Sequence, residues 1–333
     1  MFRYRTGVML VLLLLAGAGA QAQDEVISMS VLNSRKHRLG VSDNPLVGLF
    51  VSTDRGATWI HRGWKEYIRT FYSETGSDGT LWSACGNGVL RSTDNGGTWR
   101  VTTGWEVTEV LKVKVHPLSP RRVAAATAYG MVITSDGGET WRPATQGMTQ
   151  TFCSDALWLP GRGDALLAAT EDGVYRMTAG GARWSRAGLA GKGIRVLVSA
   201  PRDGGIWAGT EEDGVYRSDD GGATWTARSN GLAHRTVYAL AFHPADPAVA
   251  YAGTHDGGVY RTADGGKNWV QASAGMPDVH ALYVLRSDPS VVFAGTLNGG
   301  LFRSTDAGLS WRFDSQEDAQ VWGLSGFARE AGR

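Results

Sequence analysis

The segment from Ser92 to Trp99 reads STDNGGTW, and the chain repeats this eight-residue pattern, which we call the box. Five further copies are clear: STDRGATW from Ser52, TSDGGETW from Thr134, SDDGGATW from Ser218, TADGGKNW from Thr262 and STDAGLSW from Ser304. A degenerate copy, MTAGGARW, starts at Met177. The closing tryptophans are spaced by 40, 42, 43, 41, 44 and 42 residues. Self-similarity at a nearly fixed period of this length is the signature of a repeat architecture.

Each repeat contains four short strand signals, which are clearest in the sixth repeat. Thr236 to Phe242 and Val249 to Thr254 are apolar or alternating runs separated by a turn rich in Pro and Asp. A third run, Gly258 to Thr262, leads into the box, and Trp269 opens a fourth. Four strands in about 42 residues make one propeller blade. We therefore predict an all-β fold, a seven-bladed β-propeller of four-stranded antiparallel blades with one box turn per blade.

The other repeats give the same reading. We predict second strands at Leu81 to Ala84, Val123 to Thr127, Leu166 to Thr170, Ile206 to Thr210 and Val291 to Thr296. Two terminal segments, Val26 to Leu32 and Val321 to Ser325, both resemble the first strand of a blade. One can complete the first blade while the other adds to the last, and the sequence leaves their assignment open.

The N-terminus predicts export. Arg3 and Arg5 precede the short apolar run Val8 to Leu15, and Ala20-Gln21-Ala22 fits a cleavage site, so we expect a signal peptide over 1–22 and a single propeller domain over 23–333. The apolar run is too short to span a membrane. We expect an exported monomer, periplasmic or extracellular, without a membrane span after leader cleavage. The remaining chain carries 31 basic and 32 acidic residues, which gives no nucleic-acid footprint.

Two cysteines, Cys85 and Cys153, lie in repeats that are not neighbours. Because disulfide geometry requires close approach of the two backbones, we expect two buried thiols rather than a bridge.

The box residues predict a structural staple. Asp and the preceding Ser or Thr can accept hydrogen bonds from a tight turn, Gly at the fifth position allows a positive φ, and Trp can pack between sheets while its N–H meets a carbonyl. The alternative is that the box aspartates are catalytic or metal-binding, but one per blade around a rim cannot converge on one site. The structural set is Asp54, Asp94, Asp136, Asp220, Asp264, Asp306, Trp59, Trp99, Trp141, Trp184, Trp225, Trp269 and Trp311.

These boxes resemble the Asp-box, or bacterial neuraminidase repeat, with the pattern S-x-D-x-G-x-T-W. The resemblance covers nearly the whole chain after the leader and implies a fold rather than a function. Sialidases of this type have six blades and an R-I-P motif, xyloglucan-active enzymes need two propellers, and sortilin-type receptors have ten blades and a Cys-rich module. One exported seven-bladed ring is most similar to the photosystem II assembly/stability factor family, whose partner the resemblance does not transfer.

Two candidate sites are expected on the face opposite the boxes. The first is an acidic cluster in equivalent turns of the fourth to sixth repeats: Glu171, Glu211, Asp213 and Asp256, with Asp172 and Glu212 beside them. Paired carboxylates can serve glycoside hydrolysis or bind Ca²⁺. The alternative is ordinary hairpin chemistry, since such turns favour Asp and Gly.

The second candidate is a ring of equivalent positions on the innermost strands, counted back from the boxes: Arg69, Leu111, Ser154, Arg195, Tyr238, His280 and Trp322. Arg69, Arg195, Tyr238 and His280 would suit a carboxylate or an anionic peptide segment, with aromatic contact area from Trp64 and Trp105. The alternative is that they pack between blades with wet polar ends.

No nucleophilic triad, metal motif or phosphate loop is recognisable. We therefore expect no cofactor and no metal, and a non-catalytic exported propeller that binds a partner protein or exported peptide segment, or acts as an assembly or scaffold factor in the cell envelope. The alternative is a carbohydrate-active protein, a glycoside hydrolase or sialidase-like lectin, that uses the same face.

Overall fold

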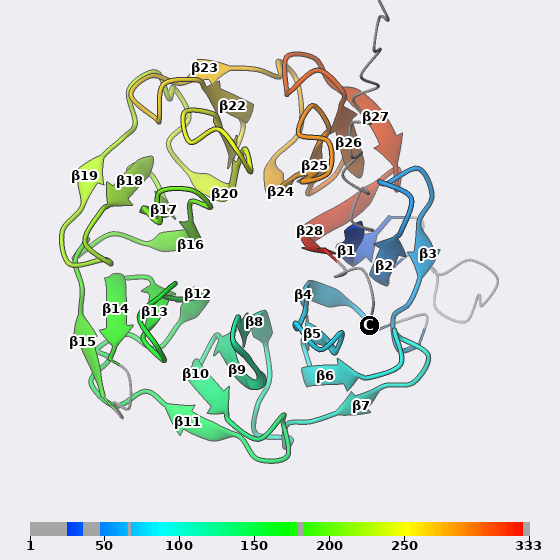
Figure 1. Ribbon diagram of the computed structural model, residues 1–333, viewed down its shortest axis with the longest axis vertical. Coiled ribbons are helices and arrows are strands. Elements are labelled where there is room, and N and C mark those ends of the chain that lie inside the picture. Colours follow the sequence, from blue (N-terminus) through cyan, green and yellow to red (C-terminus); the bar gives the residue numbers. More distant parts are fainter. Residues whose placement is uncertain (1–24, 36–46, 66–67, 179–182, 329–333) are drawn as a thin grey trace, which may run out of the picture.

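The computed structural model describes residues 25–35, 47–65, 68–178 and 183–328, in which every regular element is a strand. The strands form seven four-stranded sheets arranged as blades around a central axis (Figure 1). This confirms the predicted seven-bladed propeller. The predicted leader over 1–22 lies outside the described residues. In the part of the chain that is described, no helix has the length and apolar character needed to cross a membrane.

Six blades are built from consecutive strands, with the first strand of each nearest the axis (Figure 1). Blade 2 is β4 (Thr70–Thr75), β5 (Leu81–Cys85), β6 (Gly88–Ser92) and β7 (Arg100–Val101). Blade 3 is β8 (Val110–His116), β9 (Ser119–Thr127), β10 (Gly130–Thr134) and β11 (Arg142–Ala144). Blade 4 is β12 (Cys153–Trp158), β13 (Leu166–Thr170), β14 (Gly173–Met177) and β15 (Trp184–Arg186).

Blades 5 to 7 repeat the plan. Blade 5 is β16 (Ile194–Ser199), β17 (Ile206–Thr210), β18 (Val215–Ser218) and β19 (Thr226–Ala227). Blade 6 is β20 (Val237–Phe242), β21 (Ala250–Thr254), β22 (Gly258–Thr262) and β23 (Val270–Gln271). Blade 7 is β24 (Val279–Val284), β25 (Val292–Thr296), β26 (Leu301–Ser304) and β27 (Arg312–Ser315). The sequence predicted that Trp269 opens the outermost strand of blade 6, and this strand begins one residue later, at Val270.

Blade 1 closes the ring by joining both ends of the chain. Its strand order is β28 (Ala319–Ala328), β1 (Glu25–Ser34), β2 (Gly48–Ser52) and β3 (Ile60–His61). The C-terminal strand is therefore the first, innermost strand of this blade, as its sequence suggested. The N-terminal strand is the second one, although it resembled a first strand. Both terminal strands belong to blade 1, and neither adds to blade 7.

A buried carboxylate anchors this closure to the neighbouring blade. Glu25 on β1 is 5% exposed and accepts hydrogen bonds from the Tyr283 hydroxyl, from the backbone N–H groups of Arg286 (3.0 Å) and Ser287 (2.9 Å), and from the Ser287 hydroxyl (2.9 Å). Because these donors belong to β24 and its following turn, the N-terminal strand is tied to blade 7 as well as to blade 1.

The hydrophobic core is divided between the blades. In the described residues it forms seven clusters, and each cluster lies between two adjacent blades. The cluster between blades 5 and 6, for example, contains Trp207, Phe242 and Trp269. Each blade is therefore stabilised by its two neighbours, as expected for a repeat protein.

The boxes are hydrogen-bonded turns between third and fourth strands. In blade 2 the Ser92 hydroxyl donates to Asp94 Oδ1 (2.8 Å) and accepts from the Gly96 N–H (2.9 Å), while Thr98 donates its N–H (2.8 Å) and its hydroxyl (2.7 Å) to Asp94. Gly96 has a φ of +83°. The described boxes of blades 1, 3, 5, 6 and 7 repeat these bonds. The box residues thus make the turn contacts that the staple interpretation predicts.

The box tryptophans fasten each blade to the preceding one. Their Nε1–H groups donate to the outer strand, or the residues after it, in the preceding blade: Trp99 to Arg62 O, Trp141 to Thr102 Oγ1, Trp184 to Ala144 O, Trp225 to Ala187 O and Trp269 to Arg228 O, at 2.7–3.2 Å. The degenerate fourth copy thus keeps its tryptophan contact. Trp59 and Trp311 pack in the same way but have no hydrogen-bond partner for Nε1 among the described residues.

The two cysteines lie in separate blades. Cys85 ends β5 in blade 2 and Cys153 begins β12 in blade 4, and both are free and buried. Burial raises the pKa of each thiol to about 12.

Candidate functional site on the connection face

The turns of the propeller divide between two faces. The boxes and the turns between first and second strands lie on one face, which we call the box face. The turns between second and third strands, and the links from one blade to the next, lie on the other, which we call the connection face. Both predicted clusters belong to the connection face.

A ring of β-bulges surrounds the axis where the innermost strands begin on the connection face. In every blade one residue there is skipped by the register with the second strand. The residue before each bulge is buried, and each bulge residue is half-buried. We call these residues the axial ring: Phe71, Leu111, Ser154, Arg195, Tyr238, His280 and Trp322.

The structure corrects one member of the predicted ring. Arg69, selected by counting back from the box, precedes β4 and is exposed, and Phe71 takes the ring position in blade 2. The count fails because blade 2 has a shorter distance between its bulge and its box tryptophan, 28 residues against 30 or 31 in blades 3 to 7. The other six predicted positions are confirmed as equivalent.

Aromatic rings occupy one contiguous arc of the axial ring. Tyr238 stacks on His280 with centroids 3.9 Å apart, His280 lies 4.8 Å from Trp322, and Trp322 meets Phe71 edge-on at 5.4 Å. Burial lowers the pKa of His280 to about 3, so its imidazole is neutral at physiological pH. The arc therefore combines four blades into one uncharged aromatic surface.

Arg195, the charged member of the ring, is held by the acidic cluster. Its guanidinium donates to Glu171 (2.8 Å and 3.4 Å) and to Glu211, from the turns of blades 4 and 5. The Arg195 side chain is 18% exposed, whereas the two carboxylates are 40% and 41% exposed. Asp213 pairs separately with Lys192 (2.7 Å), and Asp172 pairs with Arg186. The predicted acidic residues therefore lie on one face but do not converge on a single point.

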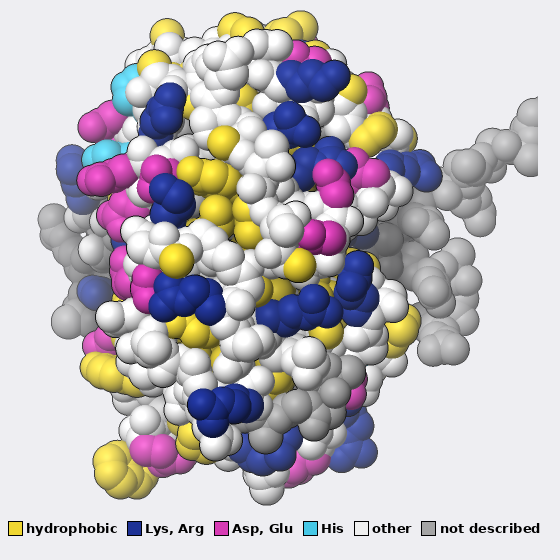
Figure 2. All heavy atoms as spheres, turned by 90° about the vertical axis from the view of Figure 1, so that its left-hand side faces the viewer, with side chains coloured by type: hydrophobic (Ala, Val, Ile, Leu, Met, Phe, Trp, Pro, Cys, Tyr) yellow, Lys and Arg dark blue, Asp and Glu magenta, His cyan; other side chains and the backbone are white. Residues whose placement is uncertain are grey.

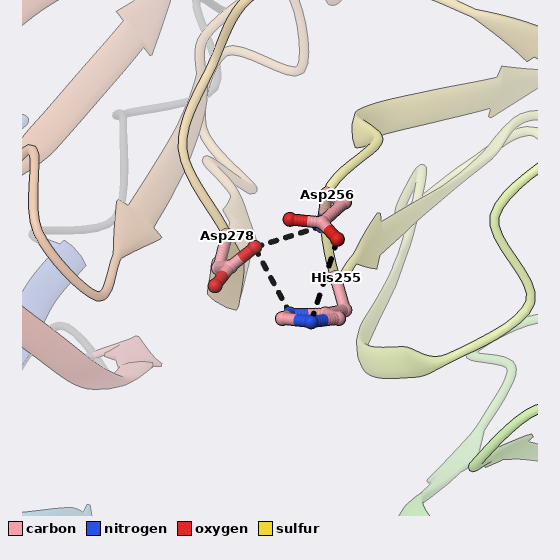
Figure 3. A group of neighbouring side chains, drawn as sticks. All are labelled: His255, Asp256 and Asp278. Atoms are coloured by element: carbon pink, nitrogen blue, oxygen red, sulfur yellow. Dashed lines mark hydrogen bonds and ion pairs between the residues drawn. The ribbon is translucent and has the colours of Figure 1, made fainter.

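Asp256 belongs to a third group, with His255 and Asp278 (Figure 3). His255 Nδ1 lies 3.1 Å from Asp278 Oδ1 and Nε2 lies 3.5 Å from Asp256, while the Asp256 N–H donates to Asp278 (2.7 Å). Their possible ligand atoms all lie within 4.8 Å of one another, a spacing that one divalent cation can bridge. His255 also meets Tyr238 edge-on, with centroids 6.2 Å apart. Sequence reasoning missed His255, which directly precedes Asp256, and Asp278, which lies two residues before His280.

A second layer of charged residues lies one step further along the innermost strands. The ammonium groups of Lys112 and Lys114 lie 4.2 Å and 4.7 Å from the centre of the Tyr72 ring, and Lys114 is 3.5 Å from Asp155. Burial lowers the pKa of Lys112 to about 8 and raises that of Glu74 to about 7. No pattern in the sequence indicates this group, because its residues alternate with core residues on three different strands.

Exposed aromatic side chains extend the face outward from the ring. Trp105, in the link between blades 2 and 3, is 91% exposed, and Tyr129, in the turn after β9, is 64% exposed. Trp64, in the link between blades 1 and 2, is half-buried. Figure 2 looks onto the rim of blades 4 and 5 and shows Asp, Glu and His side chains gathered along one edge of the disc. Lys and Arg side chains are spread more widely over the rim (Figure 2).

The repeat is also recognised by comparison with known families. The model of the BNR/Asp-box repeat matches residues 216–227, which enclose the box of blade 5. The match covers this one repeat, and the described residues hold five further box turns of the same type on a seven-bladed propeller. We therefore describe the fold of this chain as a propeller with Asp-box turns, or Asp-box propeller. No curated protein matches its sequence significantly.

Solved structures with a similar fold include a protein bound to a peptide and an enzyme. YCF48 bound to D1 peptide is 18% identical, with a TM-score of 0.59, over 85% of this chain and 94% of that one. Sqt1 from Saccharomyces cerevisiae is 16% identical, with a TM-score of 0.61, over 88% and 87%. An ancestral GH74 enzyme is 20% identical, with a TM-score of 0.56, over 69% of this chain and 35% of that one, so the Asp-box propeller spans about a third of its length. At these identities the likeness shows the fold alone.

Proposed function

We propose that this Asp-box propeller is an exported, non-catalytic protein that binds an extended segment of a partner protein on its connection face. The observation that carries the proposal is the aromatic arc of Phe71, Trp322, His280 and Tyr238. Aromatic side chains are enriched at protein interfaces, because they supply large contact area and lose little conformational freedom. Exposed Trp105 and Tyr129 extend that area on the same face.

The arrangement of the carboxylates favours binding over hydrolysis. A glycosidase needs two carboxyl groups facing one bond, one of them able to give up a proton. Here Glu171 and Glu211 both bind the Arg195 guanidinium, and Asp213 binds Lys192. Among proteins of similar fold, YCF48 has been solved with a bound peptide.

A carbohydrate-active protein is the second candidate. It is favoured by the meeting of Glu171 and Glu211 from adjacent blades at one guanidinium, since both carboxylates are about two-fifths exposed. A similar fold occurs in an ancestral GH74 enzyme.

The proposal of export rests on the N-terminal pattern of Arg3, Arg5, the apolar run and Ala22. We expect the protein recovered from the periplasm or medium of an expressing bacterium to begin at Gln23, as determined by N-terminal sequencing. A chain that stays in the cytoplasm with its first 22 residues intact would contradict export.

Binding is tested by comparing variants of the two faces. A tagged Trp105→Ala, Tyr129→Ala double variant alters the connection face at exposed positions, and Leu309→Ala, at a 69% exposed box position, is the matched control. We expect a partner captured by the wild type and by the control to be lost with the double variant. The captured protein is then purified, and its affinity for all three forms is measured by calorimetry.

A parallel screen tests the second candidate. The purified wild type is assayed against a panel of chromogenic glycosides and polysaccharides, with Glu171→Gln and Glu211→Gln as variants. Two results together would replace binding by catalysis as the function. Either substitution would abolish a detected hydrolysis, and the Trp105→Ala, Tyr129→Ala variant would still capture the partner.

A further inference from the structure

The connection face of blades 4 to 7 has an excess of negative charge. The turns between second and third strands in these blades, the links that join the four blades to one another and the adjoining ends of strands carry seven carboxylates and five permanently basic side chains. The carboxylates are Glu171, Asp172, Glu211, Glu212, Asp213, Asp256 and Asp278, and the basic side chains are Arg186, Lys192, Arg195, Arg228 and Arg235. An approaching segment therefore meets a field that attracts positive charge.

The guanidinium of the axial ring is not available to an anion. Arg195 already binds two carboxylates, Glu171 and Glu211, and the three groups together carry one net negative charge. A carboxylate ligand would have to displace one of these partners while the other still repelled it. This arrangement opposes the anionic segment that Arg195, Tyr238 and His280 suggested in the sequence.

The aromatic arc lies next to this negative region. Tyr238 and His280 stack at 3.9 Å, and His255, edge-on to Tyr238, is bound to Asp278 and lies close to Asp256. A cation over an aromatic face is attracted by the negative face of the ring, and more strongly when it is partly desolvated. Because His280 stays neutral, with a pKa of about 3, the arc does not repel a cation at physiological pH.

The remaining basic groups near the axis come from blade 3, and one of them, Lys112, adds to burial in lowering the pKa of His280. Lys112 and Lys114, on β8 in blade 3, face the Tyr72 ring, and Lys114 is paired with Asp155. They disfavour a second cation beside blade 3. The favourable position is therefore on the side of blades 5 to 7, where Tyr238 and His280 adjoin Asp256 and Asp278.

We infer that the Tyr238–His280 stack and the adjoining carboxylates Asp256, Asp278 and Glu211 form a subsite for a lysine or arginine side chain of the partner segment. This inference rests on the proposed binding function and specifies the chemistry of its partner. The ammonium or guanidinium group lies against the aromatic rings, and the carboxylates neutralise its charge.

The test is selection from a displayed library of random dodecapeptides on the immobilised wild-type protein. Counter-selection uses the Tyr238→Leu, Asp278→Asn double variant, once its melting temperature has been shown to equal that of the wild type. We expect the peptides specific for the wild type to be rich in Lys and Arg and poor in Asp and Glu. Specific peptides without this bias, or with an acidic bias, overturn the subsite and leave the binding function standing. Recovery of no peptide that distinguishes the two proteins counts against both.

One selected peptide then locates the subsite. We expect Tyr238→Leu and Asp278→Asn each to weaken its binding about 3- to 30-fold, as a lost cation–π or charge contact would. Acetylation of its lysine should weaken binding equally, and Leu309→Ala should have no effect. If neither Tyr238→Leu nor Asp278→Asn changes the affinity, the assignment is overturned. Mn²⁺ alone is titrated in parallel, and a His255-dependent Mn²⁺ site that does not compete with the peptide also contradicts it.

Discussion

Replacement of Glu25 by alanine tests whether a single buried carboxylate holds the ring closed. The Glu25 side chain joins β1 in blade 1 to the end of β24 in blade 7 through four accepted hydrogen bonds. Its loss leaves the part-buried Tyr283 hydroxyl without this acceptor. Arg286 and Ser287 are exposed, so water can reach their donors.

The expected destabilisation follows from this difference between the donors. A buried donor left without a partner costs about 1–3 kcal/mol, and a hydrogen bond that water replaces costs about 0.5–1 kcal/mol. One donor of the first kind and three of the second give several kcal/mol, from which the relief of no longer burying a carboxylate must be subtracted. We expect Glu25→Ala to lower the free energy of unfolding by about 2–4 kcal/mol.

A second substitution separates the loss of the Glu25 hydrogen bonds from a general packing defect. Tyr283→Phe removes the hydroxyl that Glu25→Ala leaves unsatisfied, so the double variant should recover about 1–2 kcal/mol relative to additivity. Glu139, an exposed carboxylate paired with Arg100, provides the control, because Glu139→Ala should change stability by less than about 0.5 kcal/mol.

Urea unfolding followed by tryptophan fluorescence measures these free energies, with the slope of each transition showing whether the unfolded state has changed. If Glu25→Ala unfolds within about 0.5 kcal/mol of the wild type, like the surface control, the carboxylate does not anchor the closure. Additive single substitutions would show that Tyr283 and Glu25 contribute independently, which would contradict an energetic contribution from the hydrogen bond between them.

Three further predictions concern the boxes, the acid stability and the thiols. Trp269→Ala should cost about 3–5 kcal/mol in urea unfolding, because the side chain is 3% exposed and donates to blade 5, whereas Trp105→Ala, at 91% exposed, should cost less than about 0.5 kcal/mol. The Thr58 hydroxyl and the Thr98 N–H, as the largest contributions, lower the pKa values of Asp54 and Asp94 to about 2. Since these folded-state values lie below the ordinary 3.8, the box contribution should be complete above about pH 4 and lost as pH falls toward 2. The melting-temperature gap between wild type and Asp94→Asn should therefore narrow over that interval, and a constant gap would contradict this origin. Burial raises the pKa of Cys85 and of Cys153 to about 12, so neither thiol should react with a disulfide reagent at pH 8 until denaturant is added, and rapid reaction of the native protein would place a thiol at the surface.

The blades were predictable from sequence because the box fixes local geometry on both sides. Its Ser, Asp and Gly determine one turn, and the strands before it must alternate to fill the clusters between blades. The predicted strands Leu166 to Thr170 and Ile206 to Thr210 coincide with β13 and β17 for this reason. The role of β1 was less predictable, since a second strand and a first strand are both buried and differ mainly in their partners.

The axial ring was predictable only where every turn has the usual length. Counting from the box located Tyr238 and His280, but it selected Arg69 in place of Phe71, because blade 2 has shorter turns. A better guide is the buried residue before each bulge, which is Thr70 in blade 2 and Val237 in blade 6. That residue keeps its position relative to the strand, whatever the length of the turns.

The charge of the expected ligand could not be read from sequence, because it depends on pairing across blades. Arg195 suggested an anion when considered alone. The structure brings Glu171 from 24 residues upstream and Glu211 from 16 residues downstream to the same guanidinium. Residues this far apart meet only because adjacent blades place equivalent turns side by side.

The two faces differ in how strongly the fold constrains their residues. On the box face each position has a fixed task, and the same residue types recur in nearly every blade. The axial ring is also repeated in position, yet its seven members are seven different residue types, from Ser154 to Trp322. At a bulge the extra residue lies outside the pairing ladder, so neither sheet register nor the cores between blades determines its side chain. Such a position can vary without unfolding the blade, which makes the axial ring the part of this propeller best able to carry a specific binding surface.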